Sequence, residues 1–257
     1  MSWDHRPDAK YKARNAVKQF TSRGIELDAS ITAAVAELDR IEAEVPRQAE
    51  PNTIRDAIVN GADSDAINAL VLAELGFTRL RSAYMQAVQV AGGRALKAFH
   101  IERDNLHAAL KVLAEHAITH LEKVAALDGA TLEELVRAGR HDDAQALAEV
   151  EVVGTELAAL YTIRDDYLTP GGLRAARVGD VDCTQWRDPQ IAGRYARVDR
   201  SVAANFVAVL RNGGELWFPT AEEAVEAAGP IHAEAKAAAA HAAEIRNRTV
   251  GSTVSFN

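Results

Sequence analysis

The stretch from Phe77 to Ala126 reads FTRLRSAYMQAVQVAGGRALKAFHIERDNLHAALKVLAEHAITHLEKVAA and sets the architecture of the chain. It contains no proline, and its only glycines are the pair Gly92-Gly93. Its apolar residues recur in steps of three and four, which places them on one face of an α-helix. A continuous helix of this length would span roughly 75 Å, at about 1.5 Å per residue. We therefore expect other helices to pack along it.

A second apolar series follows Asp142-Asp143, one of which we expect to cap the helix, and runs to Leu168. Its spacing alternates between three and four, which is typical of a coiled-coil-like seam, and Arg164 interrupts it. A capping box, Thr131-Leu-Glu-Glu134, predicts a short helix between the two long ones. We therefore predict a mainly α fold: an elongated antiparallel helical hairpin or bundle, with a smaller, irregular, partly helical C-terminal region.

Turn and cap residues mark the other boundaries. Asp28 and Asp63 are expected N-caps, and Gly76 is expected either to kink the long helix or to divide it from the preceding one. Pro230 suits the first residue of a separate final helix. Thr169-Pro170-Gly171-Gly172 is the sharpest break. These signals predict four regions: a basic N-terminal arm or helix (1–24), a helical-hairpin body (25–168), an Arg-rich irregular segment (169–200) and a small helical C-terminal region with an extended tail (201–257).

The charge of the chain is divided into blocks. The net charge is +4 over residues 1–24, −12 over 25–170, +3 over 171–211 and −3 over 212–257, which gives −8 in total. Opposed blocks suit head-to-tail packing of copies, and they suit pairing within one chain equally well.

Composition excludes several classes of protein. The single cysteine, Cys183, excludes an intramolecular disulfide and a cysteine-based zinc site. No apolar run reaches the ~18 residues of a transmembrane helix, and the N-terminus lacks the apolar segment of a secretory signal. We therefore expect no membrane partner and a cytoplasmic location at synthesis, with a virion as the later alternative.

No recognisable motif specifies a chemistry. The chain has no nucleophile elbow and no phosphate-binding glycine loop, and Asp182 beside Cys183 disfavours a reactive thiolate. His116 and His120, four residues apart, are weak metal candidates, because only Asp104…His107 approaches the Glu-x-x-His spacing of di-iron bundles. We predict no enzyme activity, no cofactor and no metal.

Arginines and aromatic residues alternate in the irregular segment. Such a mixture can bind a phosphate chain and stack bases, whereas four nearby aspartates and a pI of about 5.5 argue against a dedicated nucleic-acid binder. The other interpretation is that the arginines pair with acidic helices of the same or a neighbouring subunit. The candidate interaction residues are Arg174, Arg177, Trp186, Arg187, Arg194, Tyr195 and Arg197, with Arg200 beside them.

The stretches 77–126, 142–168 and 169–198 together resemble, in overall style, structural or assembly proteins of tailed bacteriophages that infect actinobacteria. The resemblance implies a virion or assembly role at the capsid, connector or tail, and it carries over no functional residue. The sequence thus favours a non-enzymatic structural protein that forms homo-oligomers and contacts other assembly proteins. The alternative is an accessory protein that contacts nucleic acid through residues 174–200. A weaker alternative is a metal-binding helical protein or enzyme that uses His116 and His120.

Overall fold

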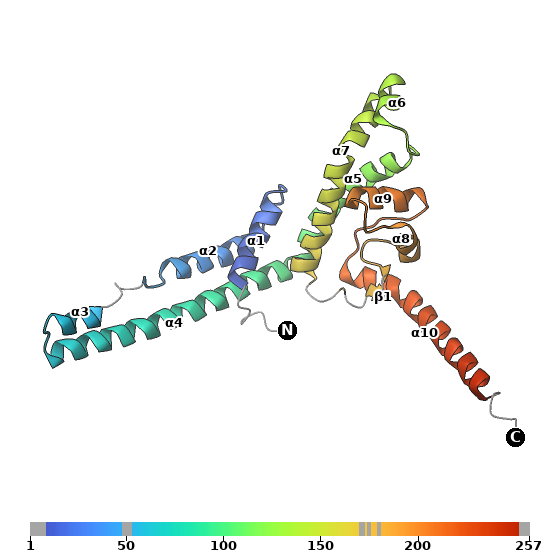
Figure 1. Cartoon of the computed structure of the whole chain (residues 1–257). Coiled ribbons are helices and arrows are strands. Elements are labelled where there is room, and N and C mark those ends of the chain that lie inside the picture. Colours follow the sequence, from blue (N-terminus) through green and yellow to red (C-terminus); the bar gives the residue numbers. More distant parts are fainter. Residues whose placement is uncertain (1–8, 48–52, 170–172, 174–175, 179–180, 252–257) are drawn as a thin grey trace. The chain divides into compact units, whose positions relative to one another are not determined.

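The protein is mainly α-helical, as the sequence predicts (Figure 1). The structure is a computed structural model that describes residues 9–47, 53–169, 173, 176–178 and 181–251. The helices are α1 (Ala9–Thr21), α2 (Ala29–Ala43), α3 (Thr53–Val59), α4 (Ser64–Ile101), α5 (Arg103–Ala125), α6 (Leu132–Arg137), α7 (His141–Ile163), α8 (Pro189–Tyr195), α9 (Val202–Arg211) and α10 (Ala221–Gly251). A π-helix, η1 (Arg164–Leu168), and two short strands, β1 (Arg177–Val178) and β2 (Val181–Asp182), complete the elements.

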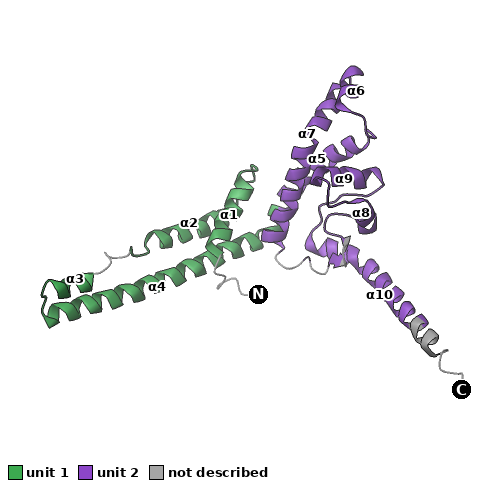
Figure 2. Cartoon of the chain, in the orientation of Figure 1, with its two compact units in different colours: residues 1–106 green, residues 107–257 purple. Residues whose placement is uncertain are grey.

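Contacts divide the chain into two compact units, residues 1–106 and 107–257 (Figure 2). The boundary lies between Leu106 and His107, in the first turn of α5. The sequence signals instead predicted one body over residues 25–168. In the structure α4 packs with α1, α2 and α3, and most of α5 belongs to the other unit.

The expected continuous helix over 77–126 is interrupted at Glu102, which corrects the prediction. Glu102 has φ −86° and ψ 11°, and its N–H still donates to the Ala98 carbonyl at the end of α4. Its carbonyl accepts from Leu106 N at 3.0 Å, which opens α5, and its carboxylate accepts from the Asn105 amide at 2.9 Å. One polar residue thus ends one helix and begins the next. Gly76, in contrast, does not divide the helix, because α4 continues through it.

In the first unit α2 runs antiparallel to α4. Arg81 of α4 donates to the Pro46 carbonyl at 2.9 Å just beyond the end of α2, and Leu38 packs near Val88. The Asp28 carboxylate accepts from Ser30 N at 2.7 Å, so the predicted N-cap of α2 is confirmed.

Helix α1 crosses α4 at a glycine. A Cβ placed on Gly92 would lie 2.6 Å from Lys10 N and 2.9 Å from Ala9 C, so the backbones of α1 and α4 are in direct contact. Further along, Phe20 stacks on Phe99 with ring centroids 5.7 Å apart. Small and aromatic residues together fix the position of α1 on α4.

In the second unit α5 and α7 form an antiparallel hairpin, as predicted for this part of the long helix. His120 Nε2 donates to the Ala146 carbonyl at 2.8 Å, and Lys123 Nζ donates to the Asp142 carbonyl at 3.1 Å. Because the higher residue number in α5 meets the lower one in α7, the two helices run in opposite directions. The Thr131–Glu134 capping box that opens α6 is also confirmed.

Two predicted helix starts are wrong. Asp142 and Asp143 lie in the first turn of α7 rather than at its N-cap, because Asp143 bonds Arg140 at 2.7 Å and Lys123 at 3.3 Å instead of a free N–H. Pro230 lies inside a continuous α10 rather than at the start of a separate helix. Helix α10 reaches Gly251, so the expected extended tail is helical up to that residue, and residues 252–257 lie outside the described part.

Candidate functional site

The predicted Arg-rich segment contains β1, β2 and α8, and the structure separates its candidate residues into three settings. Arg177 faces two carboxylates, Trp186 and Arg187 each contact an aromatic ring, and Tyr195 and Arg197 line a surface groove that Arg194 precedes in the chain. Arg174 lies outside the described residues.

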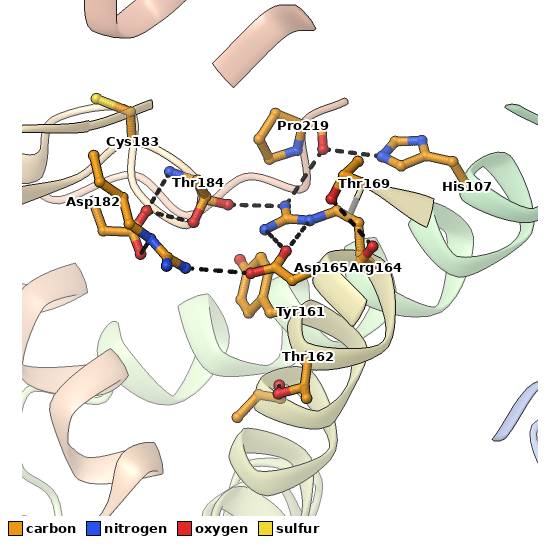
Figure 3. A network of polar contacts seen from close by, with 12 residues as sticks. His107, Tyr161, Thr162, Arg164, Asp165, Thr169, Asp182, Cys183, Thr184 and Pro219 are labelled. Atoms are coloured by element: carbon orange, nitrogen blue, oxygen red, sulfur yellow. Dashed lines mark hydrogen bonds and ion pairs between the residues drawn. The ribbon is translucent and has the colours of Figure 1, made fainter. Parts of the chain in front are cut away.

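Arg177 joins the strand pair to the end of α7. Its guanidinium lies 3.4 Å from Asp165 Oδ2 and 3.3 Å from Asp182 Oδ2 (Figure 3). Asp182 in turn accepts from Thr184 N at 2.8 Å and from the Thr184 hydroxyl. The interpretation that the arginines pair with acidic residues of the same chain is therefore correct for Arg177.

Arg164, which was not among the candidates predicted from the sequence, lies at the centre of this network. Its side chain is fully buried, and its Nε and Nη2 donate to Asp165 Oδ1 at 2.9 and 2.7 Å. Nη1 donates to the carbonyls of Thr184 at 2.9 Å and Pro219 at 3.4 Å (Figure 3). One guanidinium thus ties η1 to two segments that follow it by 20 and 55 residues.

Two aromatic rings lie beside the Arg164 guanidinium. The Tyr161 and Phe218 rings have their centroids 5.1 and 5.0 Å from its Cζ, and the two rings stack on each other at 5.4 Å. The Tyr161 hydroxyl donates to the Trp217 carbonyl at 2.8 Å. A buried cation with ion-pair, carbonyl and ring partners is characteristic of a site that holds the fold in register.

Burial shifts the titration of the groups in this network. It raises the pKa of Asp165 above its usual value, although Arg164 and then Arg177 act in the opposite direction. It also lowers the pKa of His107, so the neutral ring donates Nε2–H to the Pro219 carbonyl at 3.0 Å. Burial raises the pKa of the Tyr161 phenol and of the Cys183 thiol, the latter with a further contribution from Asp182. A thiol held protonated in this way is a poor nucleophile, as expected for Cys183.

Trp186 and Arg187 are engaged in internal packing. Trp186 is buried and forms an isolated antiparallel bridge with Leu216, and its ring lies 6.0 Å from that of Phe206. The Arg187 guanidinium lies 4.6 Å from the centre of the Trp217 ring, and its Nε pairs with Glu215 at 2.6 Å. These two candidates therefore connect segments of the second unit.

Two of the remaining candidates, Tyr195 and Arg197, line a groove of about 450 Å³ between α8, the turn that follows it and α9. The groove is lined by Tyr195, Arg197, Arg200, Ala204, Val207, Ala208, Arg211 and Asn212. We refer to it as the arginine groove. Arg194 precedes it at the end of α8.

Local capping positions the arginine groove. The Asp188 carboxylate accepts from Gln190 N and Ile191 N at 3.1 and 3.3 Å, which starts α8. Asn205 in α9 then holds the turn: its Oδ1 accepts from Arg197 N and its Nδ2 donates to Arg197 O, both at 2.8 Å. This reciprocal pair fixes the backbone that carries Arg197 and Arg200.

Neither His116 nor His120 belongs to a group of potential metal ligands among the described residues. His116 is exposed, and one ring nitrogen of His120 donates to the Ala146 carbonyl. Among the residues described, no group of three or more His, Cys, Asp and Glu side chains is arranged to hold a metal ion.

Comparisons with protein-family models, with curated proteins and with solved structures find no match for this chain. Within the described ranges, none of the helices combines the length and apolar character needed to cross a bilayer.

Proposed function

We propose that this chain is a non-enzymatic structural or assembly protein that self-associates through the N-terminal half of α4. The observation that carries the proposal is the burial pattern of this helix. Its buried residues begin only at Val88, so residues 64–87 contribute none to the core of the first unit. Yet this segment leaves several large apolar side chains exposed, and such exposed apolar residues mark a contact surface; they are Val71, Leu72, Leu75, Leu80 and Met85.

The exposed residues form a second face on α4. Leu70, Phe77 and Tyr84 are half-buried and share the face of Val88 at steps of seven residues. Leu72, Gly76, Leu80 and Ala83 follow one another at steps of four, four and three on a different side, where all four are exposed. We refer to these four residues as the α4 seam. Such spacing is that of a helix–helix contact.

The partner we propose for the α4 seam is a second copy of the chain in antiparallel orientation. The first part of the segment carries Asp63, Asp65 and Glu74, whereas the later part carries Arg79 and Arg81. Antiparallel pairing about Gly76 places the acidic part of one copy beside the basic part of the other, and parallel pairing places like charges together. No described atom lies within 4 Å of a Cβ placed on Gly76, so a second backbone has room to approach there.

The free energy of this contact can be estimated from the exposed fractions of the leucine side chains that it would bury. Leu72 and Leu80, the two leucines of the seam, are 69% and 53% exposed. Covering them in both copies is worth about 5 kcal/mol, at roughly 2 kcal/mol for a fully buried leucine. Association costs at least ~4 kcal/mol. The seam therefore supports weak, concentration-dependent association, which repeated contacts in an assembly would strengthen.

A phage particle is the setting that we propose, as a capsid, connector or tail component made in the cytoplasm. This part of the proposal rests on the resemblance of residues 77–126, 142–168 and 169–198 to such proteins and on the divided charge of the chain. The buried polar groups around Arg164 are engaged with one another, which is consistent with a structural role.

Light scattering behind a sizing column, at several protein concentrations and at low and high salt, tests self-association. We expect the mass to rise above 27.7 kDa with concentration and to fall back at high salt. The double variant Leu72→Glu/Leu80→Glu should remain monomeric. The matched control Val136→Glu/Val152→Glu, at two apolar positions of the second unit that are 51% and 73% exposed, should associate like the wild type. A wild-type monomer at every concentration, or equal association of both variants, would refute the proposal.

A further inference from the structure

Four arginines around the ends of α8 and α9 lack an acidic partner. Arg194, Arg197, Arg200 and Arg211 form no ion pair with any described residue. Arg177 and Arg187, which precede these four arginines in the chain, are both paired with carboxylates. The unpaired arginines are therefore not explained by the internal charge pairing of the second unit.

The guanidinium groups of these arginines keep N–H donors that make no hydrogen bond among the described residues. Arg197 uses Nη1 to donate to the carbonyls of Arg194 and Ala196, at 2.8 and 3.0 Å. Arg211 uses Nε for a 3.4 Å contact with the Ala125 carbonyl. The Arg200 side chain has no hydrogen bond in the described part of the chain. Each arginine thus retains N–H groups of the planar fork that recognises phosphate oxygens.

An apolar floor lies between these charges. One face of α9 carries Ala204, Val207 and Ala208, and Arg211 continues this face three residues after Ala208. Tyr195 lines the same groove and is half-buried, so its position is defined by packing. A groove of about 450 Å³ is within the usual ~300–1,000 Å³ of small-ligand sites, which is enough to take one nucleotide unit.

We propose that the arginine groove binds the phosphate chain of a single-stranded nucleic acid, with a base against Tyr195 and the apolar floor. Phosphates match the arginine forks, and an aromatic ring in a basic groove is the common arrangement for single strands. An acidic helix of a second copy would supply the negative charge but no planar group for the floor. The chain carries a net charge of −8, and Asp199 is exposed in the same turn, so we expect a short contact with few phosphates.

Fluorescence anisotropy with a dye-labelled oligo-dT of about ten nucleotides tests this assignment, with the matching duplex as a second probe. We compare the groove variant Arg197→Gln/Arg200→Gln/Arg211→Gln with a control of equal charge change, Arg40→Gln/Arg103→Gln/Arg137→Gln. The side chains of the control arginines are 56%, 41% and 74% exposed and already pair with carboxylates. Helical circular dichroism verifies that every variant is folded.

We expect the groove variant to lose at least about tenfold in affinity, since three charged contacts are removed, and the control to bind like the wild type. The slope of log affinity against log salt should fall by about 2, at ~0.7 for each neutralised phosphate of a single strand. Tyr195→Leu should weaken binding by about tenfold because the stacked base loses its ring. Arg200→Gln alone removes no hydrogen bond seen among the described residues and should weaken binding severalfold. This single variant still tests the proposal if the triple variant does not fold.

Three results would overturn the binding of nucleic acid by the groove, and a fourth would overturn the choice of a single strand. One is the absence of wild-type binding at low salt, and another is equal loss in the groove and control variants. The third is a groove variant with unchanged oligonucleotide binding but a lower mass in solution, which would assign the groove to an acidic surface of a second copy. Equal affinity for duplex and single strand would overturn the assignment of strand type. Self-association through the α4 seam is measured separately, so the two proposals fail independently.

Discussion

Substituting Gly92 by alanine tests the direct backbone contact between α1 and α4. The added Cβ would lie 2.6 Å from Lys10 N, whereas ordinary contacts begin at 3.4 Å, so α1 must retreat by about 0.8 Å. Overpacking of this kind costs ~1–3 kcal/mol, and here the obstructing atoms are backbone atoms that cannot rotate away. The helix propensity of alanine returns at most about 1 kcal/mol. We expect a net loss of about 1–2 kcal/mol, concentrated in the attachment of α1.

Gly76→Ala is the matched control in the same helix. No described atom lies within 4 Å of its added Cβ, and the residue is in the interior of α4, so the change should stabilise the helix by about 0.5–1 kcal/mol. Dilute protein is required, because Gly76 also belongs to the proposed α4 seam. The two glycine variants should thus act in opposite directions.

Amide hydrogen exchange measured on peptides from Ala9–Thr21 reports on α1 directly. Gly92→Ala should speed exchange there roughly five- to thirtyfold, since each ~1.4 kcal/mol is a factor of ten in opening. Peptides from α7 and α9 should be unaffected, and Gly76→Ala should leave α1 protected. Unchanged exchange in α1 of the Gly92→Ala variant would show that the close crossing does not exist.

Two further predictions concern the second unit. Arg164→Met should lower the free energy of unfolding by about 3 kcal/mol, because it leaves Asp165, whose side chain is 26% exposed, with only the longer contact to Arg177. Arg187→Met breaks an exposed ion pair and should cost about 1 kcal/mol or less. Urea unfolding followed by tryptophan fluorescence measures both losses, and equal losses would refute this. Burial lowers the pKa of His107, so its contribution to stability is complete above its ordinary value of 6.5 and is lost as pH falls below it, when the unfolded chain takes up the proton. His107→Gln, which retains an N–H donor, should flatten the decline in stability between about pH 7 and pH 5, and an identical pH profile would contradict the assignment.

Local signals in the sequence predicted most helix positions. Asp28, Thr131 and Glu134 make the cap hydrogen bonds expected of them, and the apolar series up to Leu168 does end in a helical segment. Such signals depend only on neighbours within a few residues, so they can be recognised without knowledge of the tertiary contacts.

Features that depend on the rest of the fold were predicted less well. Nothing in residues 101–105 resembles a usual helix stop, since the segment has neither glycine nor proline, and the break at Glu102 relies on side-chain bonds within one turn. Pro230 is a frequent first helical residue, but here α10 continues through it. The glycine pair gave no indication of a helix crossing, whereas Gly92 admits the backbone of α1.

Arg164 shows what information the sequence did carry about the buried network. It is the charged residue in an otherwise apolar seam, and that interruption was the available signal that a buried cation lies there. Its partners could not be predicted, because the Thr184 and Pro219 carbonyls are backbone atoms 20 and 55 residues away. Any residue type in those positions offers a carbonyl, so side-chain patterns do not reveal them.

The arginines of the irregular segment show why composition alone could not separate structure from binding. Arg187 and Arg197 both lie near aromatic residues and aspartates in the sequence, and both were candidates for the same role. The fold brings Glu215 to Arg187 from a distant segment, whereas the reciprocal Asn205 bonds fix the backbone of Arg197 without supplying a negative charge. A side chain that has been given a partner within the fold contributes mainly to its own unit. An arginine whose backbone is fixed but whose side chain has no acidic partner within the fold keeps its charge available for a ligand. The region to test for binding is therefore the arginine groove rather than the whole irregular segment.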